Sequence, residues 1–192
     1  MTVPPTLVLA SGSPRRHELL QRLAMPFEAV PADVDETGHP DESPMDASGR
    51  LARLKGETVA GRHEGRWVLA ADTVVDLDGE PLGKPTSADD NARLLERLSG
   101  REHAVHTGHF LASPGGCDVW VVTTRVSLRP LSQDDIRRWV EGGFGLDKAG
   151  GYAIQGPGAA LVTDVHGCYT NVMGLSVPSV LEHLGARGYV RV

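Results

Sequence analysis

Uninterrupted apolar runs alternate along the chain with segments of helical periodicity. The runs over residues 7–10 and 67–75 lack polar alternation, which is typical of strands buried on both faces of a parallel sheet. Two β-rich runs on either side of a Ser-Pro-Gly-Gly turn predict a long hairpin. Strands are therefore expected over residues 7–10, 27–30, 67–75, 103–111, 118–128 and 160–165.

Serine residues precede several of the periodic segments and mark the expected helix starts. Serine is a favourable N-cap, and proline fits the first helical position. Gly100 and Gly185 follow the third and the last of these segments and are expected to end their helices. Helices are predicted over residues 14–23, 44–62, 88–98, 133–142 and 176–184.

The first junction between a strand and a helix is a candidate site for an anion. Glycine gives this loop backbone freedom, and the helix start presents unpaired N–H groups beside two hydroxyls and two guanidinium groups. We expect it to bind an oxyanion such as a phosphate chain, although many α/β proteins have a similar turn that binds nothing. It matches neither the dinucleotide-binding nor the P-loop pattern. Its residues are Ser11, Gly12, Ser13, Pro14, Arg15 and Arg16.

Composition limits the class of protein. The 192 residues suffice for one core, or for two lobes that share one sheet, and 40% of them are hydrophobic. A net charge of −6 argues against a nucleic-acid partner, which needs a clustered positive field. Residues 1–5 do not resemble a leader, and no apolar run is long enough to span a membrane, so we expect a cytoplasmic protein with no membrane partner. Cys117 and Cys168 are too few for a disulfide framework and are expected to be reduced.

Charged residues within or beside apolar strands are the next candidates. Asp72 lies inside the run 67–75, and a buried carboxylate is costly unless it faces a cation, a metal ion or a donor network. Capping of a turn at a strand end is the alternative. Asp78 and the following glycine predict a tight hairpin that returns Lys84 alongside Asp72. Because arginine supplies most of the 19 basic residues, a role that needs a compact ammonium is expected at the three lysines, Lys55, Lys84 and Lys148.

Three other segments each have a plain structural alternative. The acidic loop over residues 31–36 carries three carboxylates, as solvated loops commonly do. The loop over residues 148–158 carries a lysine, a tyrosine and a glutamine, but its glycines also suit a flexible connector. His103, His106 and His109 alternate between the two faces of a strand, so their spacing does not favour a zinc site.

Taken in order, these segments resemble the Maf family of nucleoside triphosphate pyrophosphatases, relatives of the inosine triphosphate pyrophosphatase superfamily. No single motif is decisive, but the ordered set is specific and covers residues 7 to about 184. The matching segments are Ser11-Gly12-Ser13-Pro14-Arg15-Arg16, Val34-Asp35-Glu36, Lys55, Ala71-Asp72-Thr73, Gly83-Lys84-Pro85, Ser99-Gly100, Asp147-Lys148-Ala149-Gly150, Ile154-Gln155-Gly156 and Asn171-Val172-Met173-Gly174-Leu175.

The resemblance implies an α/β fold: an elongated mixed sheet flanked by helices, with two lobes and a central cleft in one domain over residues 1–192. It also implies a homodimer and cleavage of a nucleoside triphosphate, with Mg²⁺ or Mn²⁺, into a monophosphate and pyrophosphate. Asp72 would be the general base, and Glu36 beside it would share the metal or help to orient water. The groups implied or expected to hold the triphosphate are Ser11, Ser13, Arg15, Arg16, Lys55, Lys84 and Lys148.

The chain matches the branch of this family that prefers dTTP and UTP at Arg15, Thr73 and Gln155. A glutamine amide donates to a pyrimidine carbonyl and accepts from its N3–H, which suits uracil and thymine but not cytosine. The chain departs from the family pattern at residue 71, where glycine is commoner, at Gly151, which replaces an alanine, and at Ser176, which replaces a proline.

Two alternatives keep the same phosphate site. One is a nucleotide-binding regulator of cell division without essential catalysis, which would not need Asp72 and Glu36 together with three lysines. The other is an enzyme that removes modified pyrimidine nucleotides, for which UTP is only a surrogate. The sequence does not separate this enzyme from one that acts on dTTP and UTP, because one methyl group changes binding by only about 1 to 3 kcal/mol. A nucleic-acid-binding module is the weakest candidate.

Overall fold

The computed structural model describes residues 5–189. Residues 1–4 and 190–192 lie outside the described residues. The expectation of no leader and the outer ends of the domain expected over residues 1–192 depend on these residues. Within that range no helix has the length and apolar character needed to cross a membrane.

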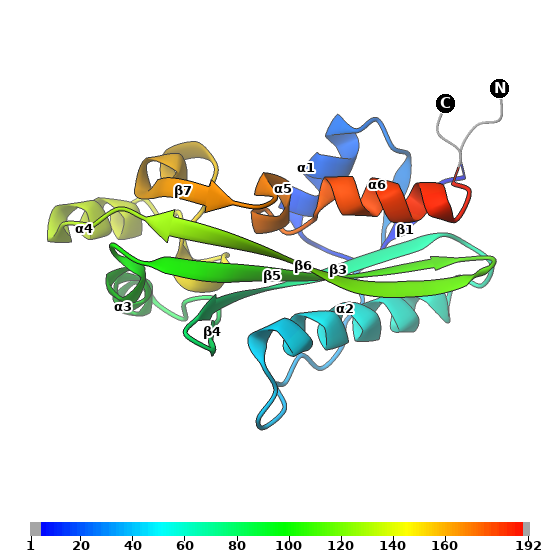
Figure 1. Cartoon of the computed structure of the whole chain (residues 1–192), viewed down its shortest axis with the longest axis horizontal. Coiled ribbons are helices and arrows are strands. Elements are labelled where there is room, and N and C mark those ends of the chain that lie inside the picture. The colour runs from blue at the N-terminus through cyan, green and yellow to red at the C-terminus, as the bar shows by residue number, and fades with distance from the viewer. Residues whose placement is uncertain (1–4, 190–192) are drawn as a thin grey trace.

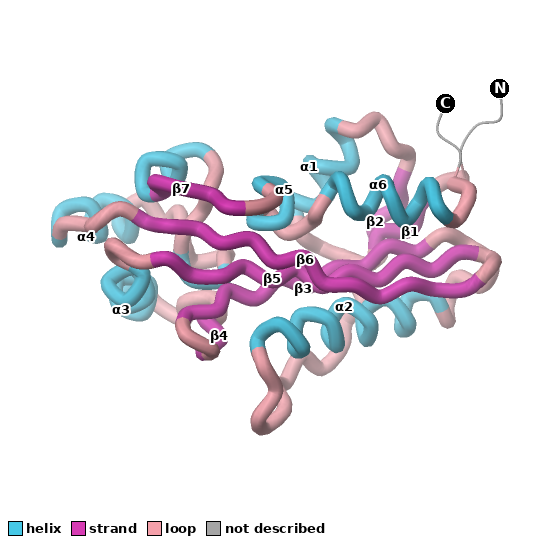
Figure 2. The backbone as a smooth tube through the Cα atoms, viewed as in Figure 1, coloured by secondary structure: helices cyan, strands magenta, loops and turns pink. Residues whose placement is uncertain are grey.

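The described residues form one mixed seven-stranded sheet in the order β2-β1-β3-β5-β6-β7, with β4 paired to β3 (Figures 1 and 2). Strand β1 pairs in parallel with β2 and β3, and all other pairs are antiparallel. The α/β fold expected from the sequence is confirmed. The strands are β1 Leu7–Leu9, β2 Phe27–Ala29, β3 Val68–Leu77, β4 Glu80–Leu82, β5 Glu102–Ser113, β6 Gly116–Leu128 and β7 Val162–His166.

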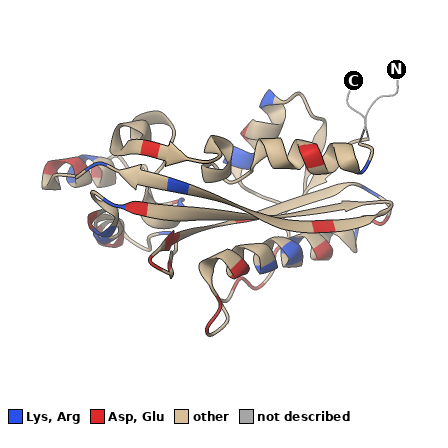
Figure 3. Cartoon of the chain, in the orientation of Figure 1, with Lys and Arg blue, Asp and Glu red and all other residues tan. Residues whose placement is uncertain are grey.

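Helix α2 covers one face of the sheet, and α1 and α6 lie on the opposite side near β1, while α3 and α4 lie at the far end (Figure 1). Basic and acidic residues are interspersed along α2 and α4 (Figure 3). The α-helices are α1 Pro14–Arg22, α2 Pro44–Ala60, α3 Ala88–Leu98, α4 Gln133–Glu141, α5 Tyr169–Val172 and α6 Val177–Ala186, and the 3₁₀ segments are η1 Ala149–Gly151 and η2 Gly156–Leu161.

Helix α2 packs closely on the sheet because glycine lies at the contact. A Cβ added to Gly108 of β5 would lie only 2.1 Å from the carbonyl oxygen of Ser48 in α2. A Cβ at Gly56 would lie 2.0 Å from the ring of Phe110. This close packing fixes the position of Lys55, the residue before Gly56, over strand β3.

The predicted caps and turn are largely confirmed. The hydroxyls of Ser43, Ser87 and Ser132 each accept the backbone N–H of the residue three positions later. Asp78 and Gly79 form the hairpin between β3 and β4 with φ values of 57° and 86°. The exception is Ser13, whose hydroxyl makes no capping hydrogen bond.

Two boundaries near the C-terminal end were predicted wrongly. Helix α6 continues through Gly185 to Ala186, and the glycine in the left-handed region is Gly188, with φ of 81°. Residues 160–161 belong to η2, so β7 begins two residues later than expected. The short helix α5 was not predicted, because four residues carry too little periodicity to detect.

Candidate active site

All of the site residues expected from the sequence line one cavity of about 1100 Å³. The carboxyl end of β1, the start of α1, the face of β3 and the glycine-rich loop between α4 and β7 surround it. The expected hairpin between β3 and β4 brings Lys84 to the same cavity as Asp72. Its lining includes Ser11, Ser13, Arg15, Arg16, Glu36, Lys55, Asp72, Thr73, Lys84, Lys148 and Gln155.

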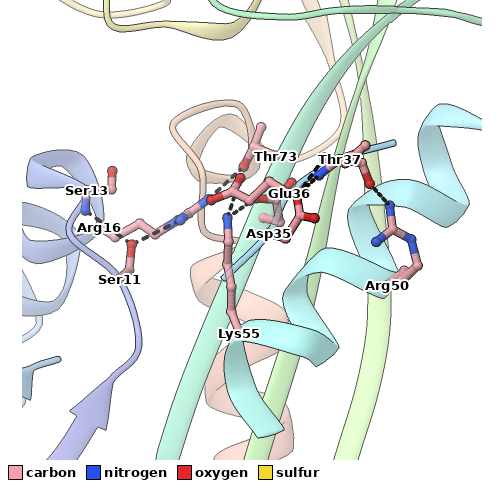
Figure 4. A network of polar contacts seen from close by, with 10 residues as sticks. Ser11, Ser13, Arg16, Asp35, Glu36, Thr37, Arg50, Lys55 and Thr73 are labelled. Atoms are coloured by element: carbon pink, nitrogen blue, oxygen red, sulfur yellow. Dashed lines mark hydrogen bonds and ion pairs between the residues drawn. The ribbon is translucent and has the colours of Figure 1, made fainter. Parts of the chain in front are cut away.

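Asp72 and Lys55 form a buried ion pair on the cavity wall. Lys55 Nζ, from α2, donates to Asp72 Oδ1 at 2.6 Å, and the two side chains are only 12% and 11% exposed. The same ammonium lies 2.9 Å from Glu36 Oε2, on the loop after β2 (Figure 4). Asp72 therefore has the cation that burial requires, and the group carries one positive and two negative charges.

The carboxylates of Asp72 and Glu36 provide oxygen atoms, the ligand type that Mg²⁺ and Mn²⁺ prefer. Among residues 5–189, no three His, Cys, Asp or Glu side chains are grouped to hold a metal ion. A pair of carboxylates nevertheless fits Mg²⁺, because this ion is commonly held by one or two carboxylates while substrate phosphates and water complete its shell. The residues present thus fit the expected metal.

Arg16 is a buried residue that connects three parts of the wall. Its Nε donates to the carbonyl oxygen of Gly174 at 2.7 Å, and its two terminal nitrogens donate to Ser11 Oγ at 3.0 Å and Thr73 Oγ1 at 3.2 Å. Burial lowers the pKa of this guanidinium, and the nearby Asp72 charge opposes that effect. Arg16 therefore ties the loop between β1 and α1 to β3 and to the loop that carries Gly174.

The loop that carries Gly174 is itself fixed to the sheet by Asn171. The Asn171 amide donates to the carbonyl oxygens of Val105 at 3.1 Å and Val122 at 3.0 Å. The backbone carbonyl oxygen of Asn171 accepts a hydrogen bond from the hydroxyl of Thr107 at 2.9 Å. Gly174 has φ of 109°, which glycine adopts without strain, and this conformation presents its carbonyl to Arg16.

The remaining cations differ in how they are partnered. Arg15 pairs with Asp147 at 2.8 Å, and Lys148 also pairs with Asp147. Lys84 is exposed, and no hydrogen bond or ion pair engages it within the described part of the chain. Its ammonium is therefore available for a ligand in the cavity.

Apolar and aromatic side chains also line the cavity, as does Gln155, which is half-buried. Tyr152 bonds through its hydroxyl to His103 Nε2 at 2.7 Å. Burial raises the pKa of Tyr152 and lowers that of His103 to about 4, so both groups are neutral near pH 7. The apolar and aromatic lining residues include Val75, Leu82, Trp139, Phe144, Tyr152, Ile154 and Met173.

The glycine-rich loop is ordered by side chains that sequence analysis did not identify. Trp139 Nε1 and Asn91 Nδ2 both donate to the Gly151 carbonyl oxygen, at 2.8 and 2.7 Å. A Cβ at Gly151 would lie 2.2 Å from Asn91 Nδ2, which explains glycine where alanine is usual. The expectation of a flexible connector is therefore not supported by these contacts.

Sequence reasoning also missed Arg50, which lines the cavity from α2. Its guanidinium donates to both oxygens of Glu42, at 2.6 and 2.8 Å. It also donates to the carbonyl of Thr37 at 3.3 Å (Figure 4). These bonds hold the loop that carries Glu36 against the helix. An arginine within an amphipathic helix gives no local signal of this role, because charged residues are common on the exposed face of such a helix.

The histidines at 103, 106 and 109 point to different partners. His106 binds Thr123 and Asp76 at 2.8 and 3.1 Å, whereas His109 accepts the backbone N–H of Ser176. His103 and His109 lie on the face of β5 opposite His106, as their spacing predicts.

The fold is a mixed α/β sheet, and its cavity contains a buried carboxylate paired with lysine. The lining combines cations with apolar and aromatic side chains, which suits an anionic ligand that has an apolar portion. The chain belongs to the Maf family, since the family model described as Maf-like protein matches residues 6–187. The resemblance noted in the sequence is thus confirmed.

Two relatives share about half of the sequence over most of its length. A protein of Thermus thermophilus named dTTP/UTP pyrophosphatase is 50% identical over 96% of this chain and 96% of its own. A protein of Myxococcus xanthus with the same name is 49% identical over 95% of this chain and 92% of its own. Among solved structures, the Staphylococcus aureus Ham1 protein has a TM-score of 0.44 and 20% identity, covering 64% of this chain and 71% of that one.

Proposed function

We propose that this protein hydrolyses dTTP and UTP to the nucleoside monophosphate and pyrophosphate. Its relatives at 50% and 49% identity carry the name of that activity. The observation that carries the proposal is the buried Asp72–Lys55 pair, which faces a cavity lined by cations and by aromatic side chains.

The charges of the site suit a triphosphate, which carries about four negative charges near neutral pH. Lys84 and Lys55 both line the cavity, which supports a role for them in offsetting the charge that develops on the departing pyrophosphate. The N-terminus of α1 adds unpaired backbone N–H groups at the same wall.

Asp72 is the group best placed to accept a proton. Its Oδ1 is held by Lys55, which leaves Oδ2 to take a proton from a water molecule. The water oxygen then bonds to the α-phosphorus as the bond from that phosphorus to the bridging oxygen breaks, and pyrophosphate leaves. Lys55 therefore orients the base while Asp72 removes the proton.

We also propose that Asp72 and Glu36 hold a divalent cation, Mg²⁺ or Mn²⁺. When bound, such an ion supplies positive charge that neutralises phosphate oxygens. Arg50 supports this role indirectly, because it fixes the loop that places Glu36 beside Lys55.

The proposed selectivity depends on the Gln155 amide. Gln155 lines the cavity, and its side chain is engaged by no hydrogen bond within residues 5–189. Its carbonyl and NH₂ groups are therefore free to pair with N3–H and a carbonyl of uracil or thymine. Cytosine has an acceptor at N3 and would meet the amide with a mismatched pattern.

The decisive experiment measures pyrophosphate release from a panel of nucleoside triphosphates, with Mg²⁺, with Mn²⁺ and with a chelator. Asp72→Asn should lower kcat for UTP on the order of a hundredfold or more, as expected for a lost general base. Asp78→Asn is the matched control, because it removes the same charge from a turn outside the cavity and should leave kcat unchanged.

Near wild-type turnover by Asp72→Asn would remove this residue from the mechanism. Binding of UTP by the wild-type protein without any pyrophosphate release would contradict the enzyme and favour the non-catalytic regulator.

A further inference from the structure

Asp147 is an acidic residue among the cations of the cavity. It accepts a hydrogen bond from an Arg15 terminal nitrogen at 2.8 Å and another from Lys148 Nζ. Burial tends to raise the pKa of Asp147, but the bonds from Lys148 and Arg15 outweigh it, and the pKa lies below its usual value. Two of the expected phosphate-binding cations therefore share one carboxylate as their partner.

The Arg15–Asp147 pair links the hydrophobic cluster that contains Leu19 and Leu20 to the one that contains Val75 and Leu98. Arg15 lies in the first turn of α1, which packs through Leu19 and Leu20 against β1. Asp147 comes shortly before η1, where a Cβ added to Gly150 would lie 3.2 Å from Val75 and 3.5 Å from Leu98. The two residues are 132 positions apart in the sequence, so the contact depends on how the two clusters sit around the cavity.

The exposure of this pair makes it easy to break. Asp147 is 62% exposed and Arg15 is 29% exposed, whereas the Asp72–Lys55 pair is almost fully buried. Ion pairs that contact water contribute little net stability. A phosphate group, which carries more charge and more acceptor oxygens than a carboxylate, therefore competes well for both cations.

We propose that Asp147 is an exchangeable counter-ion for the phosphate chain. In the free protein it holds the Arg15 guanidinium and the Lys148 ammonium at the cavity wall. It yields them to phosphate oxygens when the ligand enters and recovers them as pyrophosphate leaves. Asp147 is then a positioning residue that favours product release, and this inference rests on the proposed function for the identity of that product.

The test is the affinity for inorganic pyrophosphate, measured by isothermal titration calorimetry in metal-free buffer. Asp147→Asn removes the competing charge and should bind pyrophosphate about two- to fivefold more tightly than the wild type, the range expected for an exposed pair. When Asp147→Asn is added to an Arg15→Ala variant, the gain in pyrophosphate affinity over Arg15→Ala alone should be smaller, because one of the two released cations is then absent. In turnover with UTP, Asp147→Asn should show lower kcat and stronger inhibition by pyrophosphate.

Asp134→Asn is the matched control. Asp134 pairs with Arg137 at 2.9 Å on α4, and both side chains are 62% exposed and lie outside the cavity lining. This variant changes the net charge equally and should leave pyrophosphate affinity unchanged. Equal gains in both variants would mean a general charge effect and would overturn the proposal.

Equal or weaker pyrophosphate binding by Asp147→Asn also overturns it, as does the absence of detectable binding to either protein. The calorimetric result does not depend on turnover. If the wild-type protein does not hydrolyse UTP but Asp147→Asn binds pyrophosphate more tightly, the proposed enzymatic function is rejected. The proposal that Asp147 is an exchangeable counter-ion is then still supported.

Discussion

A buried hydrogen bond between His109 and Ser176 offers a quantitative test of how the wall of the cavity is held. The Ser176 N–H donates to His109 Nε2 at 3.0 Å, and the two residues are 0% and 2% exposed. Burial lowers the pKa of His109 to about 3, so the ring is neutral and its proton lies on Nδ1. Ser176 is two residues from Gly174, whose carbonyl binds Arg16.

Ser176 is also the position where the family pattern has proline. Its φ of −73° at the start of α6 is compatible with proline, which has no N–H to donate. The serine and the histidine therefore depend on each other: without His109 the buried N–H has no acceptor, and without the N–H the ring nitrogen Nε2 has no donor.

The magnitude follows from the cost of a buried unsatisfied group, about 1 to 3 kcal/mol. His109→Leu and Ser176→Pro each leave one such group, whereas the double variant leaves neither. The four proteins, wild type, two single variants and the double variant, form a double-mutant cycle. Other effects, such as loss of His109 stacking on Trp120, occur in both the single and the double variant and cancel in this cycle. The double variant should thus be more stable than the sum of the single effects by about 1 to 2 kcal/mol.

The assay is thermal unfolding of the wild type, both single variants and the double variant at pH 7.5. A coupling of this size corresponds to a Tm about 2 to 8 °C above the additive value for a chain of this length. Ser176→Ala keeps the N–H and is the control, so it should show no coupling to His109→Leu. Additive Tm changes for the proline pair would refute the reasoning.

Two other predictions follow from the site and the buried histidines. Gln155→Glu should weaken discrimination between UTP and CTP, measured as the ratio of their kcat/KM values; an unchanged ratio would place base readout elsewhere. His103 and His109 have folded pKa values of about 4 and about 3, below the ordinary 6.5, so the unfolded chain binds protons that the folded chain does not. The free energy of unfolding should be constant with respect to these two groups above pH 6.5 and fall below it, by up to about 1.4 kcal/mol per pH unit for each. Urea unfolding between pH 7.5 and 5 measures this slope, which His109→Leu should reduce by about half, and a flat profile in the wild type would contradict the burial of both rings.

Much of the local structure was predictable because it depends on neighbouring residues. Apolar runs marked the central strands, and serine caps marked the starts of α2, α3 and α4. Asp78 with Gly79 marked the hairpin after β3. The sequence also indicated that Asp72 needs a cation, because a carboxylate in an apolar strand must be compensated. It could not say which of the lysines supplies that cation.

The tertiary structure decided the partners, because side chains far apart in the sequence meet only when the sheet and helices pack. Lys55 reaches Asp72 because Gly56 and Gly108 let α2 approach the sheet. Arg16, expected mainly as a phosphate ligand, is buried with protein acceptors because the Gly174 loop folds back over it. Asp147 faces Arg15 only because two clusters of the core enclose one cavity, and no local pattern records a contact across 132 residues.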